Sequence, residues 1–282
     1  MIAELTKTQW LNILGITEAQ IPNLLILSGT RSLKRHCDMY RRPFTHIRHL
    51  TLDGFLHDAF VGRLNGRTVG YAGVYGAAMA ADVVHLFGLL GTRMVLQTGC
   101  CRPLVDKIAP GDLFIATEAY AGAGVAPYYP PRREVVSAQF YGLELAVFQQ
   151  ITGRIVHWGR VYSSAAPLMR PKHPPSPWYG KGCWVFDRQT AATYAVAQYF
   201  GMARAAILAV AASPIPRPDH TPYGPDLACE RDLLEISLKI ARACSAELAA
   251  PPPQSPPADL VRNLLDRVLE DDRIPRSAGE VC

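Results

Sequence analysis

The sequence lacks any long apolar run and any strong excess of one charge, and both absences exclude classes of protein. No stretch of about 18 consecutive apolar residues occurs, so no membrane-spanning helix and no membrane partner is expected. The opening MIAELTKTQW has no charged leader followed by an apolar stretch, so we expect a cytoplasmic protein. The 29 lysines and arginines against 24 acidic residues give a net charge of only +5, which does not indicate a nucleic-acid partner.

Patterns for metal sites and disulfides are also missing. The seven cysteines are odd in number and include no C-x-x-C pair, which fits neither a disulfide framework nor a structural zinc site. The eight histidines show no spacing such as H-E-x-x-H, so we expect neither a metal nor a cofactor. Adjacent Cys100 and Cys101 allow two interpretations: a reactive pair, or two small residues packed below a strand, of which we prefer the second.

What the chain does contain is an alternation of β-rich apolar runs with helical patterns. Its 282 residues, 49% of them apolar, are enough to bury one large core. The alternation predicts an α/β fold with a mixed, mostly parallel central sheet flanked by helices. We expect strands at 23–29, 67–74, 93–99, 112–118, 154–163 and 205–213, and helices at 77–90, 190–200 and 229–249.

The distribution of proline predicts where this domain ends. We expect one α/β domain over residues 1–250, followed by a proline-rich linker and a C-terminal helical tail over residues 251–282. Two further proline-rich stretches, 126–132 and 167–177, are long loops of the kind that bind or cover ligands.

The carboxyl ends of the strands are the expected location of a ligand site. In open α/β sheets ligands bind at this edge. We therefore expect the strand ends at Gly29, Gly99 and Ser213 to lie side by side.

Four segments, in this order, carry a resemblance to a known family. They are ILSGTRSLKRH (26–36), GVYGAAMAADVVHLFGLLGTRMVLQTGCCRPLVDKIAPGDLFIATEA (73–119), GRVYSSAAPLM (159–169) and VFDRQTAATYAVAQYFG (185–201). Together they resemble the nucleoside phosphorylase and nucleosidase superfamily, which includes purine nucleoside and uridine phosphorylases. The resemblance implies an enzyme that acts on a nucleoside-like small molecule, with phosphate or water as acceptor, and that assembles as a homodimer or higher homo-oligomer.

The resemblance implies a phosphate-binding turn at the end of the 93–99 strand, where the family has the pattern R-x-G-[ST]-C-G. Gly99 and Cys101 match this pattern. Gln97 replaces the arginine, Cys100 replaces the hydroxyl residue, and Arg102 replaces the last glycine. A neutral amide lacks the charge-assisted bidentate contact of a guanidinium group, and a thiol is a weak donor. We therefore expect poor binding of inorganic phosphate, unless Arg102 restores the charge rather than lying exposed at the strand end.

The first loop departs from the family in a similar way. It keeps Gly29 but has Leu33 at the position of the family arginine, with Arg31, Lys34 and Arg35 nearby. Two interpretations carry equal weight: an anion site built from cations and backbone amides, or the solvated basic start of a helix.

Sugar and base recognition also differ. The Met-Glu pair of the family becomes Arg188–Gln189, and residues 211–214 lack the aspartate that protonates the base. Gln189 can still exchange hydrogen bonds with a hydroxyl group, but it brings no charge. Asp187 allows two roles, an acid in a rearranged site or the cap of the following helix, and we prefer the cap.

These observations predict a divergent nucleoside phosphorylase-like enzyme that acts on a nucleoside, a nucleotide or a related molecule, at an N-glycosidic bond. The alternative is a catalytically altered or inactive member that binds a ligand or supports a different reaction. The candidate catalytic residues are Arg188, Gln189 and Asp187, and the candidate substrate-binding residues are Gly29, Arg31, Gln97, Gly99, Cys100, Arg102 and Met169.

Overall fold

The computed structural model describes residues 5–52, 56–121, 124–139, 153–165, 181–211 and 227–247. The helices in this part of the chain are α1 (Lys7–Leu14), η2 (Glu18–Gln20), α2 (Leu33–Arg41), α3 (Ala77–Leu90), η3 (Ala126–Tyr128), α5 (Thr190–Tyr199) and α6 (Leu227–Glu247). The strands are β1 (Leu24–Gly29), β2 (Thr45–Leu52), β3 (Leu56–Leu64), β4 (Arg67–Val74), β5 (Met94–Pro103), β6 (Leu113–Ala121), β7 (Val135–Ser137), β8 (Val156–Ser163), β9 (Cys183–Asp187) and β10 (Ala203–Val210).

The strands form one mixed sheet with a parallel centre. β4, β1, β5 and β10 lie side by side and run parallel, whereas β3 and β2 extend this sheet antiparallel beyond β4. Every residue of β1 is buried, as expected for a parallel strand covered on both faces. Successive side chains of β1 point to opposite faces, so that Leu24 and Ile26 join one core cluster and Leu25 and Leu27 another.

The other half of the sheet closes on itself. β10 pairs with β6, β6 with β8, β8 with β9, and β9 with the end of β5, which also pairs with β10. These pairings make a closed circuit of strands with β5 as the strand shared between circuit and open sheet. The end of β5 therefore lies where the two halves of the sheet meet.

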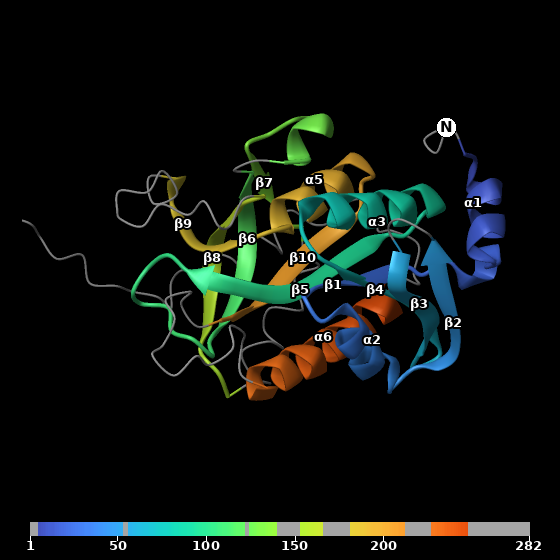
Figure 1. Ribbon diagram of the computed structural model, residues 1–282, viewed down its shortest axis with the longest axis horizontal. Helices are drawn as coiled ribbons and strands as arrows, with labels where there is room; N and C mark the ends of the chain where they lie inside the picture. The colour runs from blue at the N-terminus through green and yellow to red at the C-terminus, as the bar shows by residue number, and fades with distance from the viewer. Residues whose placement is uncertain are drawn as a thin grey trace, which may run out of the picture.

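Helices cover both faces of the sheet, as Figure 1 shows. α3 and α5 pack together on one face, and α2 and α6 lie on the opposite face. The start of α2 follows β1 and the start of α5 follows β9, so both helices begin at the strand ends that carry the candidate residues.

The predicted α/β class is confirmed, and the expected strands and helices correspond to β1, β4, β5, β6, β8, β10, α3, α5 and α6. The sequence prediction missed α1, α2, β2, β3, β7 and β9. One signal for the β3–β4 hairpin is present in the sequence: Asn65 and Gly66 both adopt positive φ, at 50° and 75°, in the two-residue turn.

Some of the expected features fall outside the described residues. These are Met169, the strand end at Ser213, the loop 167–177 and the tail 251–282. None of the helices that the structure does describe is both long and apolar enough to cross a membrane.

Candidate active site

The ends of β1 and β5 carry two glycines at which an added side chain would overlap neighbouring atoms. Gly29 pairs in register with Gly99. Of the three strand ends expected to lie side by side, these two are therefore confirmed as neighbours. A Cβ atom added to Gly29 would lie 1.6 Å from Nε2 of Gln189, and one added to Gly99 would lie 2.8 Å from the carbonyl oxygen of Gly29. The buried Gln189 amide therefore packs directly on this glycine pair.

The two glycines give a testable contrast. Gly29→Ala is expected to destabilise the fold by about 1–3 kcal/mol, because the new methyl group overlaps the Gln189 side chain. Adding Gln189→Ala should recover most of this loss, because it removes the overlapping atoms. Gly99→Ala should not be recovered by Gln189→Ala, because its methyl group meets backbone. Melting temperatures of the single and double variants test this, and equal recovery in both backgrounds would contradict the packing described.

Asp187 anchors the start of α5. Its Oδ2 accepts hydrogen bonds from the backbone amide of Thr190 at 3.0 Å and from the Thr190 hydroxyl at 2.5 Å. Its Oδ1 accepts from the Ser163 hydroxyl at 2.6 Å. Burial raises the pKa of Asp187, while the hydrogen bonds from Ser163 and Thr190 oppose that rise. Asp187 thus binds the first amide of α5 from two positions before the N-cap residue, Gln189.

Gln97 points into the same buried group. Its Nε2 donates to the Thr190 hydroxyl at 2.6 Å and to Oδ2 of Asp187 at 3.3 Å. The side chain is fully buried. At the position where the family arginine is expected, Gln97 thus links β5 to the start of α5.

Arg188 lies beside an aromatic ring at the end of β4. Its guanidinium carbon is 4.6 Å from the ring centroid of Tyr75, within the range of a cation–π contact. Arg31, from the loop after β1, approaches the same ring at 6.0 Å. Tyr75 is 43% exposed, Arg31 is exposed and Arg188 is half-buried. Two cations from distant parts of the chain thus share one exposed ring.

The acidic residues Asp187 and Glu118 are both engaged with other partners. The carboxylate of Asp187 faces Ser163 and Thr190, and Glu118 binds the guanidinium group of Arg160 at 2.9 and 2.7 Å. Within the part of the chain that the structure describes, no carboxylate forms an ion pair with Arg188 or Arg31. Arg188 is therefore available to a ligand.

The two adjacent cysteines are protonated at neutral pH. Burial, helped by the charge of Glu230 and opposed by Arg102 and Arg31, raises the pKa of Cys100 to about 12. Burial also raises the pKa of Cys101 well above its ordinary value. A thiol held protonated is a poor nucleophile, so the geometry favours packing over a reactive pair.

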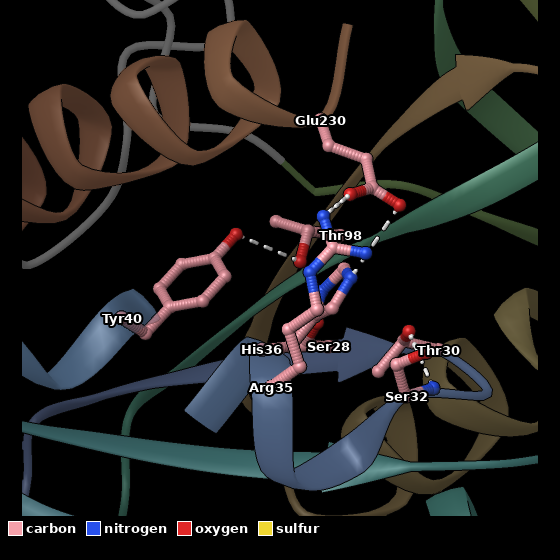
Figure 2. Close-up of polar contacts among 8 residues, drawn as sticks. All are labelled: Ser28, Thr30, Ser32, Arg35, His36, Tyr40, Thr98 and Glu230. Atoms are coloured by element: carbon pink, nitrogen blue, oxygen red, sulfur yellow. Dashed lines mark hydrogen bonds and ion pairs between the residues drawn. The ribbon is translucent and has the colours of Figure 1, made fainter. Parts of the chain in front are cut away.

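A polar network not anticipated from the sequence lies beside these residues (Figure 2). Glu230 points from the start of α6 toward α2, where its Oε2 lies 2.7 Å from Nη2 of Arg35 and its Oε1 lies 3.7 Å from Nε2 of His36. The other ring nitrogen of His36, Nδ1, lies 3.4 Å from the Ser28 hydroxyl. Burial lowers the pKa of His36, so its ring is held mainly neutral.

A second part of the network joins the same elements. The Tyr40 hydroxyl donates to Oγ1 of Thr98 at 3.2 Å and contacts the Ser237 hydroxyl at 2.9 Å. Tyr40 lies on α2, Thr98 on β5 and Ser237 on α6. These hydrogen bonds therefore connect α2 and α6 to β5, the strand that contains Gly99.

The structure thus sorts the candidate residues into groups. Gly29, Gly99 and Gln189 are in contact, Arg31 and Arg188 share Tyr75, and Gln97 and Asp187 lie together in the anchor of α5. Cys100 and Arg102 follow Gly99 on β5, where Arg102 pairs in register with Phe186. Among the described residues, no three His, Cys, Asp or Glu side chains form a group that could hold a metal ion.

Sequence reasoning missed Tyr75, His36 and Glu230 as members of this region. Tyr75 was within reach, because it stands in the GVYG turn of the second matching segment, directly after β4. The contact of Glu230 with Arg35 could not be predicted from a local pattern, because the two residues are 195 positions apart in the sequence.

Comparisons with known proteins agree with this fold. The family profile of the phosphorylase superfamily matches residues 48–244. No curated protein matches the sequence. Uridine phosphorylase from Vibrio fischeri ES114 complexed with 6-hydroxy-1-naphthoic acid is similar with a TM-score of 0.62 and 19% identity, covering 83% of this chain and 93% of that chain. Another structure of that enzyme gives a TM-score of 0.61, 19% identity, and coverage of 82% and 93%.

The two kinds of match support different statements. At 19% identity the structural likeness shows a shared fold. The profile covers most of the chain, although it begins after the loop that contains Gly29 and Arg31. On the profile match, the chain belongs to the phosphorylase superfamily.

Proposed function

We propose that this protein is a nucleoside phosphorylase-like enzyme that cleaves the N-glycosidic bond of a nucleoside carrying an anionic group, such as a nucleotide. The observation that carries the proposal is the approach of Arg31 and Arg188 to one exposed ring, Tyr75, at the strand ends. Two guanidinium groups without a carboxylate partner among the described residues favour an anionic ligand. The exposed ring offers a face on which a flat base or sugar packs.

The remaining candidates have assigned roles in this proposal. Gln189, packed on Gly29 and Gly99, binds a hydroxyl group of the ligand through its amide. Asp187 and Gln97 hold the start of α5 and so position Arg188 and Gln189. Cys100, Arg102 and Met169 remain candidate substrate contacts. We further propose that the protein assembles as a homo-oligomer.

A thermal-shift screen tests the ligand class. Uridine, inosine and adenosine are compared with their 5′-monophosphates, each with and without inorganic phosphate. The nucleotides are expected to raise the melting temperature more than the nucleosides do, because only they bring charge to Arg31 and Arg188. Equal stabilisation by nucleosides, or strong phosphate-dependent release of base from them, would contradict the proposal.

The alternative, ligand binding without turnover, is favoured by one observation. Both carboxylate oxygens of Asp187 accept hydrogen bonds from protein donors, so Asp187 is poorly placed to give a proton to a leaving base. Chromatographic assay for free base separates the two functions. A nucleotide that stabilises the protein but is never cleaved, under any acceptor condition, supports the binding function.

A further inference from the structure

The loop between β1 and α2 carries an unusual concentration of positive charge. We call Arg31, Lys34 and Arg35 the β1–α2 cation cluster, and His36, whose ring is held mainly neutral, follows it on α2. Arg31, Lys34 and Arg35 are exposed, and His36 is buried. Without a counter-charge such a group would attract small oxyanions such as inorganic phosphate from solution.

The cluster already has an anion, and that anion belongs to the protein. Glu230 binds Arg35 at 2.7 Å and lies 3.7 Å from His36 (Figure 2). Its side chain is only 13% exposed, whereas that of Arg35 is 49% exposed. Glu230 thus lies on the protein side of the cluster, and its charge also acts on the Cys100 thiol directly after Gly99. The carboxylate is therefore close to the strand end where an oxyanion would approach.

Three backbone amides of this segment already have acceptors within the protein. The amide of Thr30 donates to the carbonyl of Val74 at 3.0 Å, and the amide of Ser32 donates to the Thr30 hydroxyl at 3.1 Å. The amide of His36 is used within α2, by the carbonyl of Ser32. Among the side chains of this segment, the guanidinium group of Arg35 is occupied by Glu230.

On the basis of the proposed function, we infer that Glu230 is a specificity-determining residue. It serves as the built-in anion of the β1–α2 cation cluster and excludes inorganic phosphate from the end of β1. The anionic group of the substrate is thereby directed to Arg31 and Arg188 around Tyr75. A fixed carboxylate repels a phosphate dianion and also occupies the donors that would bind it.

Calorimetric titration with inorganic phosphate tests the role of Glu230 in the full chain. Glu230→Gln is expected to bind phosphate about tenfold or more tightly than the wild type, because it removes the repulsion and frees Arg35. Glu235→Gln is the matched control, since Glu235 lies on the same helix but forms an exposed pair with Lys239. Its phosphate affinity should equal that of the wild type.

A second substitution identifies the group that binds phosphate. Adding Arg35→Met to Glu230→Gln should abolish the gain. The inference is wrong if Glu230→Gln and the wild type bind phosphate equally, or if Glu235→Gln gains as much. If Glu230→Gln does not fold, Glu230→Asp is measured instead, because the shorter side chain keeps the charge but holds it farther from Arg35. Its phosphate affinity is expected to rise several-fold over that of the wild type. An unchanged affinity would contradict the role of Glu230.

The outcome is distinguishable from failure of the proposed function. Phosphate affinity is measured without turnover, so a gain in Glu230→Gln supports the role of Glu230 even if no nucleotide is cleaved. Conversely, cleavage of nucleotides with unchanged phosphate affinity in Glu230→Gln leaves the proposed function intact and removes the role of Glu230.

Discussion

Arg188→Met is expected to weaken nucleotide binding about ten- to a hundredfold, since a hydrogen bond to a charged group contributes about 1.5–3 kcal/mol. Arg188 contacts the ring of Tyr75 at 4.6 Å and has no carboxylate partner among the described residues, so its charge is free to meet a ligand. Methionine keeps an unbranched apolar chain beside the ring and removes only the charge and the donors. The fold should therefore lose little stability.

The measurement is the dissociation constant of a nucleotide and of the matching nucleoside for each variant. Nucleoside affinity should change little, because the lost interaction is with the anionic group. Arg67→Met serves as the control, because Arg67 lies exposed at the start of β4, the far end of the strand from Tyr75. Equal loss for nucleotide and nucleoside would show that Arg188 does not bind the anionic group, and no loss at all would remove it from the site.

Arg31→Met should act in the same direction but more weakly. Its guanidinium carbon lies 6.0 Å from the Tyr75 ring, farther than that of Arg188, and its side chain is exposed. Because both arginines would contact one ligand group, their effects are not expected to add. Tyr75 thus links a residue after β1 with a residue after β9.

The sequence predicted the parts of the fold that depend on local pattern. Buried parallel strands are continuous apolar runs, and LLILSG became β1 with every residue buried. By contrast, α2 was missed because LKRHCDMYR has several cations and few large apolar residues. Its buried face is His36, Cys37 and Tyr40, and the helix is held to α6 by the hydrogen bond of Tyr40 to Ser237 and by the ion pair of the exposed Arg35 with Glu230, not by apolar contacts alone.

The candidate site was predictable at single positions but not as an arrangement. The resemblance located Gly29, Gly99 and Gln189 correctly at one edge of the sheet, and the register of β1 with β5 follows from parallel pairing. The sequence could not show that Gln97 turns toward Thr190 or that Glu230 reaches Arg35. Both contacts depend on the packing of elements that are about 90 and 195 positions apart in the chain.

Asp187→Ala is expected to lower the free energy of unfolding by about 3–5 kcal/mol, the usual cost of removing the partner of several buried polar groups. The substitution would leave the amide and hydroxyl of Thr190 and the hydroxyl of Ser163 without their acceptor, and it would remove the weaker of the two hydrogen bonds of the Gln97 amide. The first amide of α5 would thereby lose the acceptor that helps to fix where the helix begins.

Asp187→Asn separates this anchoring role from an acid role. The asparagine oxygen can still accept from Thr190, and the Ser163 hydroxyl can turn to accept from the new amide, so we expect a loss of only about 1–2 kcal/mol. Urea unfolding measures both variants, and base release is assayed alongside. If Asp187 anchors α5, Asp187→Asn keeps most of its stability and nucleotide affinity and much of any cleavage activity. If cleavage is lost while stability and affinity are intact, Asp187 acts in the chemistry instead, because only then is its ionisable proton required.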